Sequence, residues 1–177
     1  KTFMYGFEES YGYLVQPFVR DKDAIQALVM VAEMTAYFKE QDFSLFDAIH
    51  QLYHEHGHYV EKTISVKMDG MEGTEKINEI MSSFRSNPPK KFGDIQVSMA
   101  EDFKEQRRIE GDTEESIALP PANVLKYTLA DSSWIAIRPS GTEPKIKFYI
   151  SATDDSGVVV QEKIEAFEAD IRSKVDM

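Results

Sequence analysis

Apolar and polar residues alternate with a period of two in five short segments of the chain. Such alternation puts apolar side chains on one face and polar side chains on the other, which predicts half-buried β-strands. These predicted strands cover residues 61–68, 95–100, 124–128, 133–138 and 145–152. Two more short strands are expected within residues 1–19, the first at residues 2–5, around a loop from Gly6 to Gly12.

Apolar spacing of three and four residues predicts four α-helices. They cover residues 24–40, a segment from Ser44 up to Gly57, and residues 74–86 and 159–175. Asp23 is the expected N-cap of the first helix, Ser44 and Asp47 form a capping box for the second, and Gly57 stops it. The first helix has a broad apolar face around Leu28, which predicts burial on more than one side.

The order of these elements indicates an α+β protein with a domain boundary near residues 57–62. Residues 1–58 are expected to be the C-terminal part of an α/β domain. Residues 59–177 are expected to form a compact domain, with a mainly antiparallel sheet and helices on one face. Residues 101–121 are charged and then Pro-rich, so they are predicted to be a long surface excursion.

The amino-acid composition limits the functional classes to which the protein can belong. The 177 residues are 42% hydrophobic, and no apolar run is long enough for a membrane span or resembles a signal peptide. A net charge of −11 without a basic stripe argues against nucleic acid as a partner. Cysteine is absent, so the default location is cytoplasmic. The chain begins without Met inside an apparent strand, so a fragment of a longer protein is expected.

The loop between the last two predicted strands reads Arg-Pro-Ser-Gly-Thr-Glu-Pro-Lys and carries more donors than a hairpin needs. Arg138 offers a planar fork for two phosphate oxygens, and Ser140 and Thr142 add hydroxyl donors. Gly141 lets backbone N–H groups approach an anion, and Lys145 adds positive charge. This set fits a phosphate monoester. The alternative is a plain hairpin in which the proline and the glycine serve only to turn the chain.

Four histidines raise the question of a metal site. His50 and His54 are one helical turn apart, beside Asp47, so ligands could converge there. His56 and His58 stand on either side of the expected helix end at Gly57, where histidines also interact well with the helix dipole. We expect no metal site in this chain.

Two motifs together identify a family resemblance. The run RPSGTEPKIK resembles the phosphate-binding loop in the last of the four domains of the α-D-phosphohexomutases. The run GFEESYGYL resembles the sugar-binding loop of their third domain. The GFEES form, followed by VRDKDA, is most similar to the phosphoglucomutase/phosphomannomutase branch. The resemblance covers the whole chain: the end of domain 3 in residues 1–58 and domain 4 in residues 59–177.

The resemblance implies roles for residues of both loops. Glu8 and Ser10 match the positions that contact the sugar, and Lys22 is expected to border the same site. The phosphate-binding positions are matched by Arg138, Ser140, Gly141, Thr142 and Lys145. The family's phosphoserine loop and its magnesium loop have no match here, so neither catalytic nor metal residues are expected in this chain. The chain alone is therefore expected to be inactive.

For the full-length protein, the resemblance implies an isomerase that interconverts hexose 1-phosphate and hexose 6-phosphate, most similar to phosphoglucomutase. Mg²⁺, bound by the missing N-terminal domains, and glucose 1,6-bisphosphate, as intermediate, are the implied cofactors. The implied partners are a phosphosugar and those N-terminal domains, with no nucleic acid and no membrane. Two alternatives stay open: a phosphomannomutase, or a non-catalytic module that binds phosphosugars.

Overall fold

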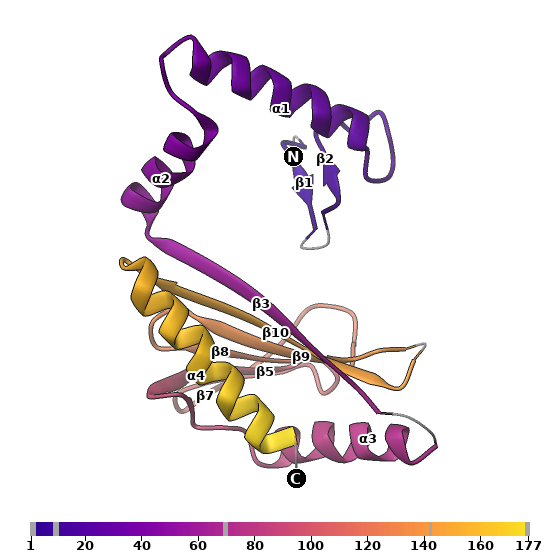
Figure 1. Ribbon diagram of the computed structural model, residues 1–177. Helices are drawn as coiled ribbons and strands as arrows, with labels where there is room; N and C mark the ends of the chain where they lie inside the picture. The colour runs from indigo at the N-terminus through magenta and orange to yellow at the C-terminus, as the bar shows by residue number, and fades with distance from the viewer. Residues whose placement is uncertain (1–2, 9–10, 69–70, 142, 176–177) are drawn as a thin grey trace. The chain divides into compact units, whose positions relative to one another are not determined.

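The computed structural model describes residues 3–8, 11–68, 71–141 and 143–175. It divides into two compact units, residues 1–55 and residues 56–177. The first unit holds a two-stranded antiparallel hairpin, β1 (Gly6–Phe7) and β2 (Tyr13–Leu14), and the helices α1 (Ala24–Lys39) and α2 (Leu45–His56) (Figure 1). The strand expected at residues 2–5 is wrong for residues 3–5, because the hairpin register pairs Gly6 with Leu14 and starts the strand there, and Thr2 lies outside the described residues.

The helix caps of the first unit form as expected. The Asp23 carboxylate accepts hydrogen bonds from the backbone N–H groups of Ile25 and Gln26, at 2.9 and 3.4 Å. Ser44 and Asp47 bond reciprocally, since Ser44 N–H donates to the Asp47 carboxylate (2.9 Å) and Asp47 N–H donates to Ser44 Oγ (3.1 Å). These pairs satisfy N–H groups that have no partner inside the helix.

The predicted burial of the first helix is wrong for the residues that the structure describes. No residue of α1 is buried, and Leu28 is 67% exposed on its apolar face. The sequence pattern shows which face is apolar. It does not supply the element that covers that face.

The second unit is built on one antiparallel sheet. Its strand order is β3-β10-β9-β8-β5-β6-β7, with β4 paired to β5 beside this path. The strands are β3 (His58–Lys67), β4 (Lys91–Phe92), β5 (Ile95–Asp102), β6 (Arg107–Glu110), β7 (Thr113–Ser116), β8 (Leu125–Leu129), β9 (Trp134–Pro139) and β10 (Lys145–Asp154). All the pairings between them are antiparallel.

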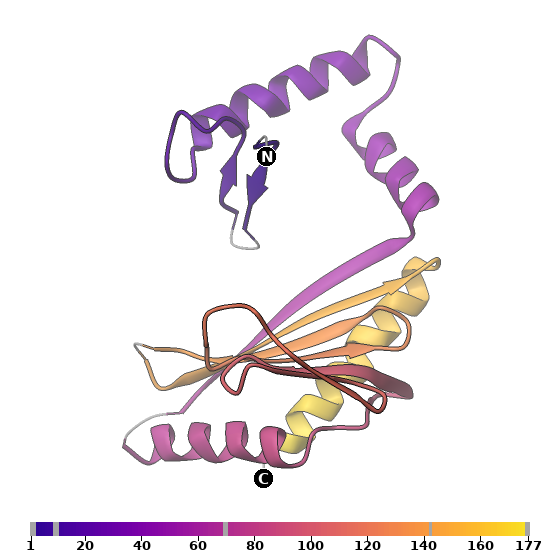
Figure 2. The same cartoon turned by 180° about the vertical axis from the view of Figure 1, so that it is seen from behind.

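Two helices, α3 (Met71–Ser86) and α4 (Gly157–Val175), cover one face of this sheet (Figures 1 and 2). Their buried side chains and the inward-facing strand residues form a single apolar cluster. Its most completely buried members include Phe92, Ile135, Ile137, Ile146, Phe148, Val160 and Ile164. The α+β fold expected from the sequence, with helices on one face, is confirmed.

The surface excursion expected at residues 101–121 is wrong for residues 101–116, which form strands and the turns between them. Strand β5 runs to Asp102, and β6 and β7 form a hairpin there. Gln106 and Gly111 turn the chain with φ of 52° and 58°. Charged pairs replace apolar alternation, because the Arg108 guanidinium donates to the Glu101 carboxylate of the neighbouring strand at 2.7 and 2.9 Å. No period-two apolar signal marks such strands.

Candidate functional site

The loop between β9 and β10 is held at both ends by backbone hydrogen bonds. Ser140 N–H donates to the Lys145 carbonyl at 2.8 Å, and Lys145 N–H donates to the Glu143 carbonyl at 2.8 Å. Met68 N–H, just after β3, donates to the Pro144 carbonyl at 2.9 Å. Two strands and the end of a third therefore fix the position of this loop.

Strand register gathers cationic side chains on the sheet face that carries no helix. Ile146 and Phe148 of β10 point into the core, so Lys145 and Lys147 point to the opposite face. Lys147 lies directly opposite Arg138 on β9, and Lys145 lies directly opposite Lys67 on β3. Directly opposite residues share one face, with Cβ atoms about 5 Å apart. Four cationic groups therefore surround the loop.

Glu143 is the acidic residue of the loop, and it lies among these cations. Its carboxylate forms an ion pair with the Lys145 ammonium group. That contact, with the nearby charges of Lys67 and Lys147, holds the pKa of Glu143 below its usual range. The carboxylate therefore stays ionised at neutral pH.

The Arg138 side chain is available to a ligand. It is exposed, and within the described part of the chain its guanidinium forms no hydrogen bond or ion pair. The Lys147 ammonium lies 5.8 Å from the centre of the Tyr149 ring, at cation–π distance. An anion above this face would meet one guanidinium with all its donors unused.

The loop also leaves space above its glycine. A Cβ added at Gly141 would have no heavy atom within 4 Å, so the chain's own packing does not require glycine there. Close approach by a ligand remains a physical reason for it. Ser140 is half-buried beside this point, and Thr142 lies outside the described residues.

Sequence reasoning missed Lys67 and Lys147 as members of this cluster. Lys147 could have been found, because alternation along the strand puts it on the same face as Lys145. Lys67 lies about eighty residues earlier in the chain, and only the register of β3 against β10 brings it opposite Lys145.

In the first unit, Glu8 and Lys22 converge beside the hairpin loop. Glu8 N–H donates to the Gly12 carbonyl at 2.8 Å, and the Lys22 Nζ lies 3.5 Å from the Glu8 carboxylate. A Cβ on Gly12 would lie 2.2 Å from the Lys22 Cδ atom, so glycine lets the lysine stem cross the loop. Asp23 N–H donates to the Tyr13 carbonyl and holds the start of α1 against this hairpin.

These residues line a hollow of about 560 Å³. Glu8 and Lys22 supply its charges, and Tyr11 and Tyr13 supply aromatic rings. Tyr11 is 87% exposed and has a φ of 63°, a strained value for a bulky residue. The two tyrosines were not predicted as site residues, although an exposed aromatic ring in a loop is a usable signal. Ser10 lies outside the described residues.

Within the described part of the chain, the histidines belong to no group of side chains that could hold a metal ion. His50 makes an edge contact with Tyr53 instead, and Asp47 is engaged by Ser44, whose hydrogen bonds lower the pKa of that carboxyl. No described helix is both long and apolar enough to span a membrane.

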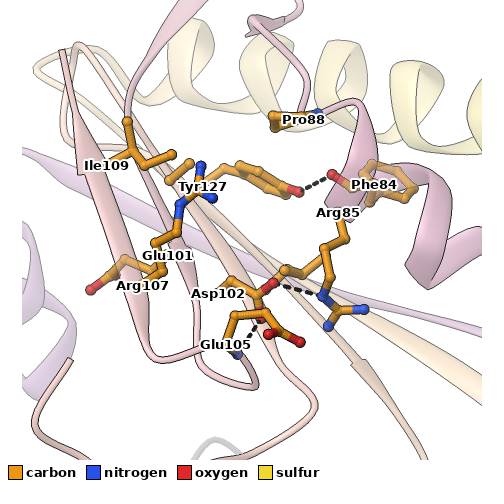
Figure 3. A pocket seen from close by; sticks show the side chains of 11 residues that line it. Phe84, Arg85, Pro88, Glu101, Asp102, Glu105, Arg107, Ile109 and Tyr127 are labelled. Carbon is orange, nitrogen blue, oxygen red and sulfur yellow. Dashed lines mark hydrogen bonds and ion pairs between the residues drawn. The ribbon is translucent and has the colours of Figure 1, made fainter. Parts of the chain in front are cut away.

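A smaller hollow of about 120 Å³ lies between the end of α3 and strands β5, β6 and β8 (Figure 3). The Tyr127 hydroxyl donates to the Phe84 carbonyl at 2.9 Å, and Arg85 Nε donates to the Asp102 carboxylate at 2.6 Å. Burial raises the pKa of Tyr127, so its phenol stays protonated. These polar groups pair with one another, which indicates a structural role, and no sequence-predicted site residue lines this hollow.

Comparison with known proteins agrees with both motifs. The family described as "Phosphoglucomutase/phosphomannomutase, C-terminal domain" matches residues 91–171. The family described as "Phosphoglucomutase/phosphomannomutase, alpha/beta/alpha domain III" matches residues 1–56. The two matches follow the order of the motifs along the chain.

Curated relatives give the same assignment. The chain is 41% identical over 166 residues to a phosphoglucomutase of Staphylococcus haemolyticus, and 40% identical over 168 residues to one of Staphylococcus aureus. These matches cover 93% and 94% of this chain and 30% of each relative, so the chain spans about a third of their length.

Among solved structures, the fold resembles the open form of the exocytosis-sensitive phosphoprotein pp63/parafusin, a phosphoglucomutase from Paramecium. The TM-score is 0.60 at 18% identity, over 95% of this chain and 28% of that one. With both family domains matched in order, at residues 1–56 and 91–171, the chain belongs to the phosphoglucomutase/phosphomannomutase family.

Proposed function

We propose that this chain supplies sugar and phosphate binding to a phosphoglucomutase that interconverts glucose 1-phosphate and glucose 6-phosphate. The relatives that are about 40% identical carry that name. The observation that carries the proposal is the exposed Arg138 guanidinium, directly opposite Lys147 and beside the Lys145 end of its loop. A phosphate dianion needs such a set of fixed donors and cations.

The proposed role of the loop is positioning. In the reaction that the family resemblance implies, a phosphoryl group passes from the enzyme to the sugar and gives a bisphosphate. The other phosphate then returns to the enzyme. Arg138, Ser140, Gly141, Thr142 and Lys145 would hold the phosphate that is not being transferred. Holding that group fixes the distance of the reacting oxygen from the transferring phosphoryl, which lowers the entropic part of the barrier.

The proposed sugar-binding residues are Glu8, Ser10 and Lys22, which would form hydrogen bonds with the sugar hydroxyls. A carboxylate accepts hydrogen bonds from two neighbouring hydroxyls, and each bond is stronger than one between neutral groups. The 3.5 Å contact of Lys22 with Glu8 keeps that carboxylate beside the hollow of the first unit. The phosphoglucomutase and phosphomannomutase proposals differ in which sugar hydroxyls would form hydrogen bonds with these residues.

Magnesium is proposed to be bound outside this chain. The described residues offer no group of three or more carboxylate or imidazole ligands that could hold a metal ion. When bound in the full-length protein, the ion would supply charge neutralisation at the transferring phosphate. The residues of this chain would contribute only binding and orientation.

The test is a titration of glucose 6-phosphate into the chain, with binding monitored by NMR. Three variants at one position are compared with the parent. Arg138→Ala should weaken binding about tenfold or more, because a charge-assisted hydrogen bond contributes about 1.5–3 kcal/mol. Arg138→Lys should recover part of the affinity, since an ammonium group cannot form the two-pronged contact. Arg138→Gln keeps a hydrogen-bond donor but removes the charge. It therefore separates the contribution of hydrogen bonding to affinity from the contribution of charge. Unchanged affinity in Arg138→Ala would refute the proposal.

A further inference from the structure

Lys67 and Lys145 place two positive charges side by side at the end of the loop. The two lysines lie directly opposite each other on β3 and β10, where like charges destabilise a strand pair. The Glu143 carboxylate forms an ion pair with Lys145, and the charge of Lys67 also acts on this carboxylate. The Glu143 side chain is 57% exposed, so solvent and solutes reach the pair.

A phosphate monoester would bring the same kind of charge to the same ammonium groups. We infer that Glu143 and a bound phosphate compete for Lys145 and Lys67, so that Lys67 is a further phosphate-binding residue and Glu143 weakens phosphate affinity. This inference rests on the proposed function, because it places the phosphate at the loop from Arg138 to Lys145. It adds one residue of the neighbouring strand β3 and gives the acidic residue of the loop a role.

The backbone hydrogen bonds of the loop do not involve the Glu143 carboxylate, so this side chain can be displaced by phosphate without breaking them. Lys145 N–H bonds the Glu143 carbonyl, and Met68 N–H bonds the Pro144 carbonyl, so the loop keeps its shape when the Glu143 carboxylate turns away. The low pKa of Glu143 means that it competes in its charged form throughout the neutral range. Removing its charge should therefore strengthen phosphate binding, while removing the charge of Lys67 should weaken it.

The experiment measures dissociation constants for glucose 6-phosphate by NMR titration of the 177-residue chain. Glu143→Gln should lower the constant about two- to fivefold and Lys67→Met should raise it about two- to fivefold, the size expected for exposed ion pairs. Both effects should shrink as ionic strength rises. Glucose, which has no phosphate, should show no difference among the variants.

Matched variants control for net charge. The variants are Glu162→Gln and Lys90→Met. Glu162 lies on α4, on the helix-covered side of the sheet. Lys90 precedes β4, and its carbonyl accepts a hydrogen bond from Val97 N–H, at the end of β5 away from the loop. Neither variant should change the dissociation constant. If the parent binds glucose 6-phosphate and both Glu143→Gln and Lys67→Met leave its affinity unchanged, the inference is wrong while the proposed function stands. If the parent shows no binding, both are wrong.

Discussion

Replacing Lys163 with Met should destabilise the second unit, because this lysine joins three segments. Its ammonium group donates to the Asp131 carboxylate at 2.8 Å and to the Thr153 carbonyl at 2.7 Å. It also lies 2.8 Å from the Asp154 carboxylate. One side chain of α4 thereby holds the turn after β8 and the end of β10.

The expected loss lies between two known limits. The Lys163 side chain is 16% exposed, and the two carboxylates are 24% and 27% exposed. Exposed ion pairs contribute about 0.2–1 kcal/mol, whereas breaking a buried pair costs about 3–5 kcal/mol. Met keeps most of the aliphatic stem, so the packing loss is small. We expect the free energy of unfolding to fall by about 2 kcal/mol.

Urea denaturation followed by tryptophan fluorescence measures this loss. The sequence has one tryptophan, Trp134, which lies on β9 in the second unit. Its fluorescence therefore reports unfolding of the unit that contains Lys163. The urea midpoint should fall at an unchanged slope, since the slope follows the surface exposed on unfolding.

The pH dependence gives an independent check. Burial acts to raise the pKa of Asp131, but hydrogen bonds from Lys163 and Ser133 outweigh it and lower that pKa. The hydrogen bond from Lys163 also lowers the pKa of Asp154. Groups with a lowered folded-state pKa stabilise above the unfolded value of about 3.9. The difference between Lys163→Met and the parent should therefore be full at pH 7 and shrink below about pH 4.

At high pH, the stabilising contribution of Lys163 changes with pH in the opposite direction. Burial acts to lower the pKa of Lys163, but its two carboxylate partners raise it overall. Its contribution is therefore full below the unfolded lysine value of about 10.4 and is lost as pH rises through the higher folded value. Lys90→Met, on a lysine without a described ion pair, is the control. A change below about 0.3 kcal/mol in Lys163→Met, or a change that is equal at pH 7 and pH 3.5, would refute the reasoning.

Two further variants test the small hollow and the hairpin. Asp102→Asn should lower the free energy of unfolding by about 1–2 kcal/mol, because it weakens the ion pair with Arg85, whereas Asp112→Asn, in the exposed turn after β6, should not; equal urea midpoints would contradict this. Gly12→Ala should displace the Lys22 stem, since the new Cβ would lie 2.2 Å from its Cδ atom. The amide resonances near Lys22 should shift while those of the second unit stay, and an unchanged spectrum would show that the stem does not cross the loop.

The elements that sequence reasoning predicted well have local causes. The caps at Asp23 and Ser44 depend on side chains within three residues of the N–H groups that they bond. Gly57 ends α2 with a φ of 83°, a value that glycine adopts without strain. The strands of the core sheet alternate because one face is buried. Each of these signals can be read without knowing the partners in the fold.

The elements that were missed depend on cross-strand partners. Strand β6 is recognisable only when the Arg108 guanidinium is seen to bond Glu101 across the ladder. The start of β1 follows from its register with β2, and the sequence of residues 1–19 does not fix that register. Periodicity identifies an apolar face, so it finds strands that pack on a core and misses strands held by charge pairs.

The candidate phosphate site shows the same limit. Arg138, Ser140 and Lys145 could be named because they lie in one short motif. Lys67 could not, since its place beside Lys145 is a consequence of strand pairing over a long distance in sequence. The sequence also could not assign Glu143 to the lysines around it, because that contact depends on the fold of the loop.

In the second unit, one face of the sheet packs in the core and stabilises the fold, and the other face carries the candidate binding residues. Apolar residues face α3 and α4, while Lys67, Arg138, Lys145 and Lys147 face away from them. In a chain of net charge −11, such a concentration of cations attracts an anion to one place. Arg138 is exposed and forms no ion pair with a described residue, so removing its charge breaks no such pair in the fold. Loss of binding in Arg138→Ala at an unchanged urea midpoint therefore separates a ligand contact from a structural one.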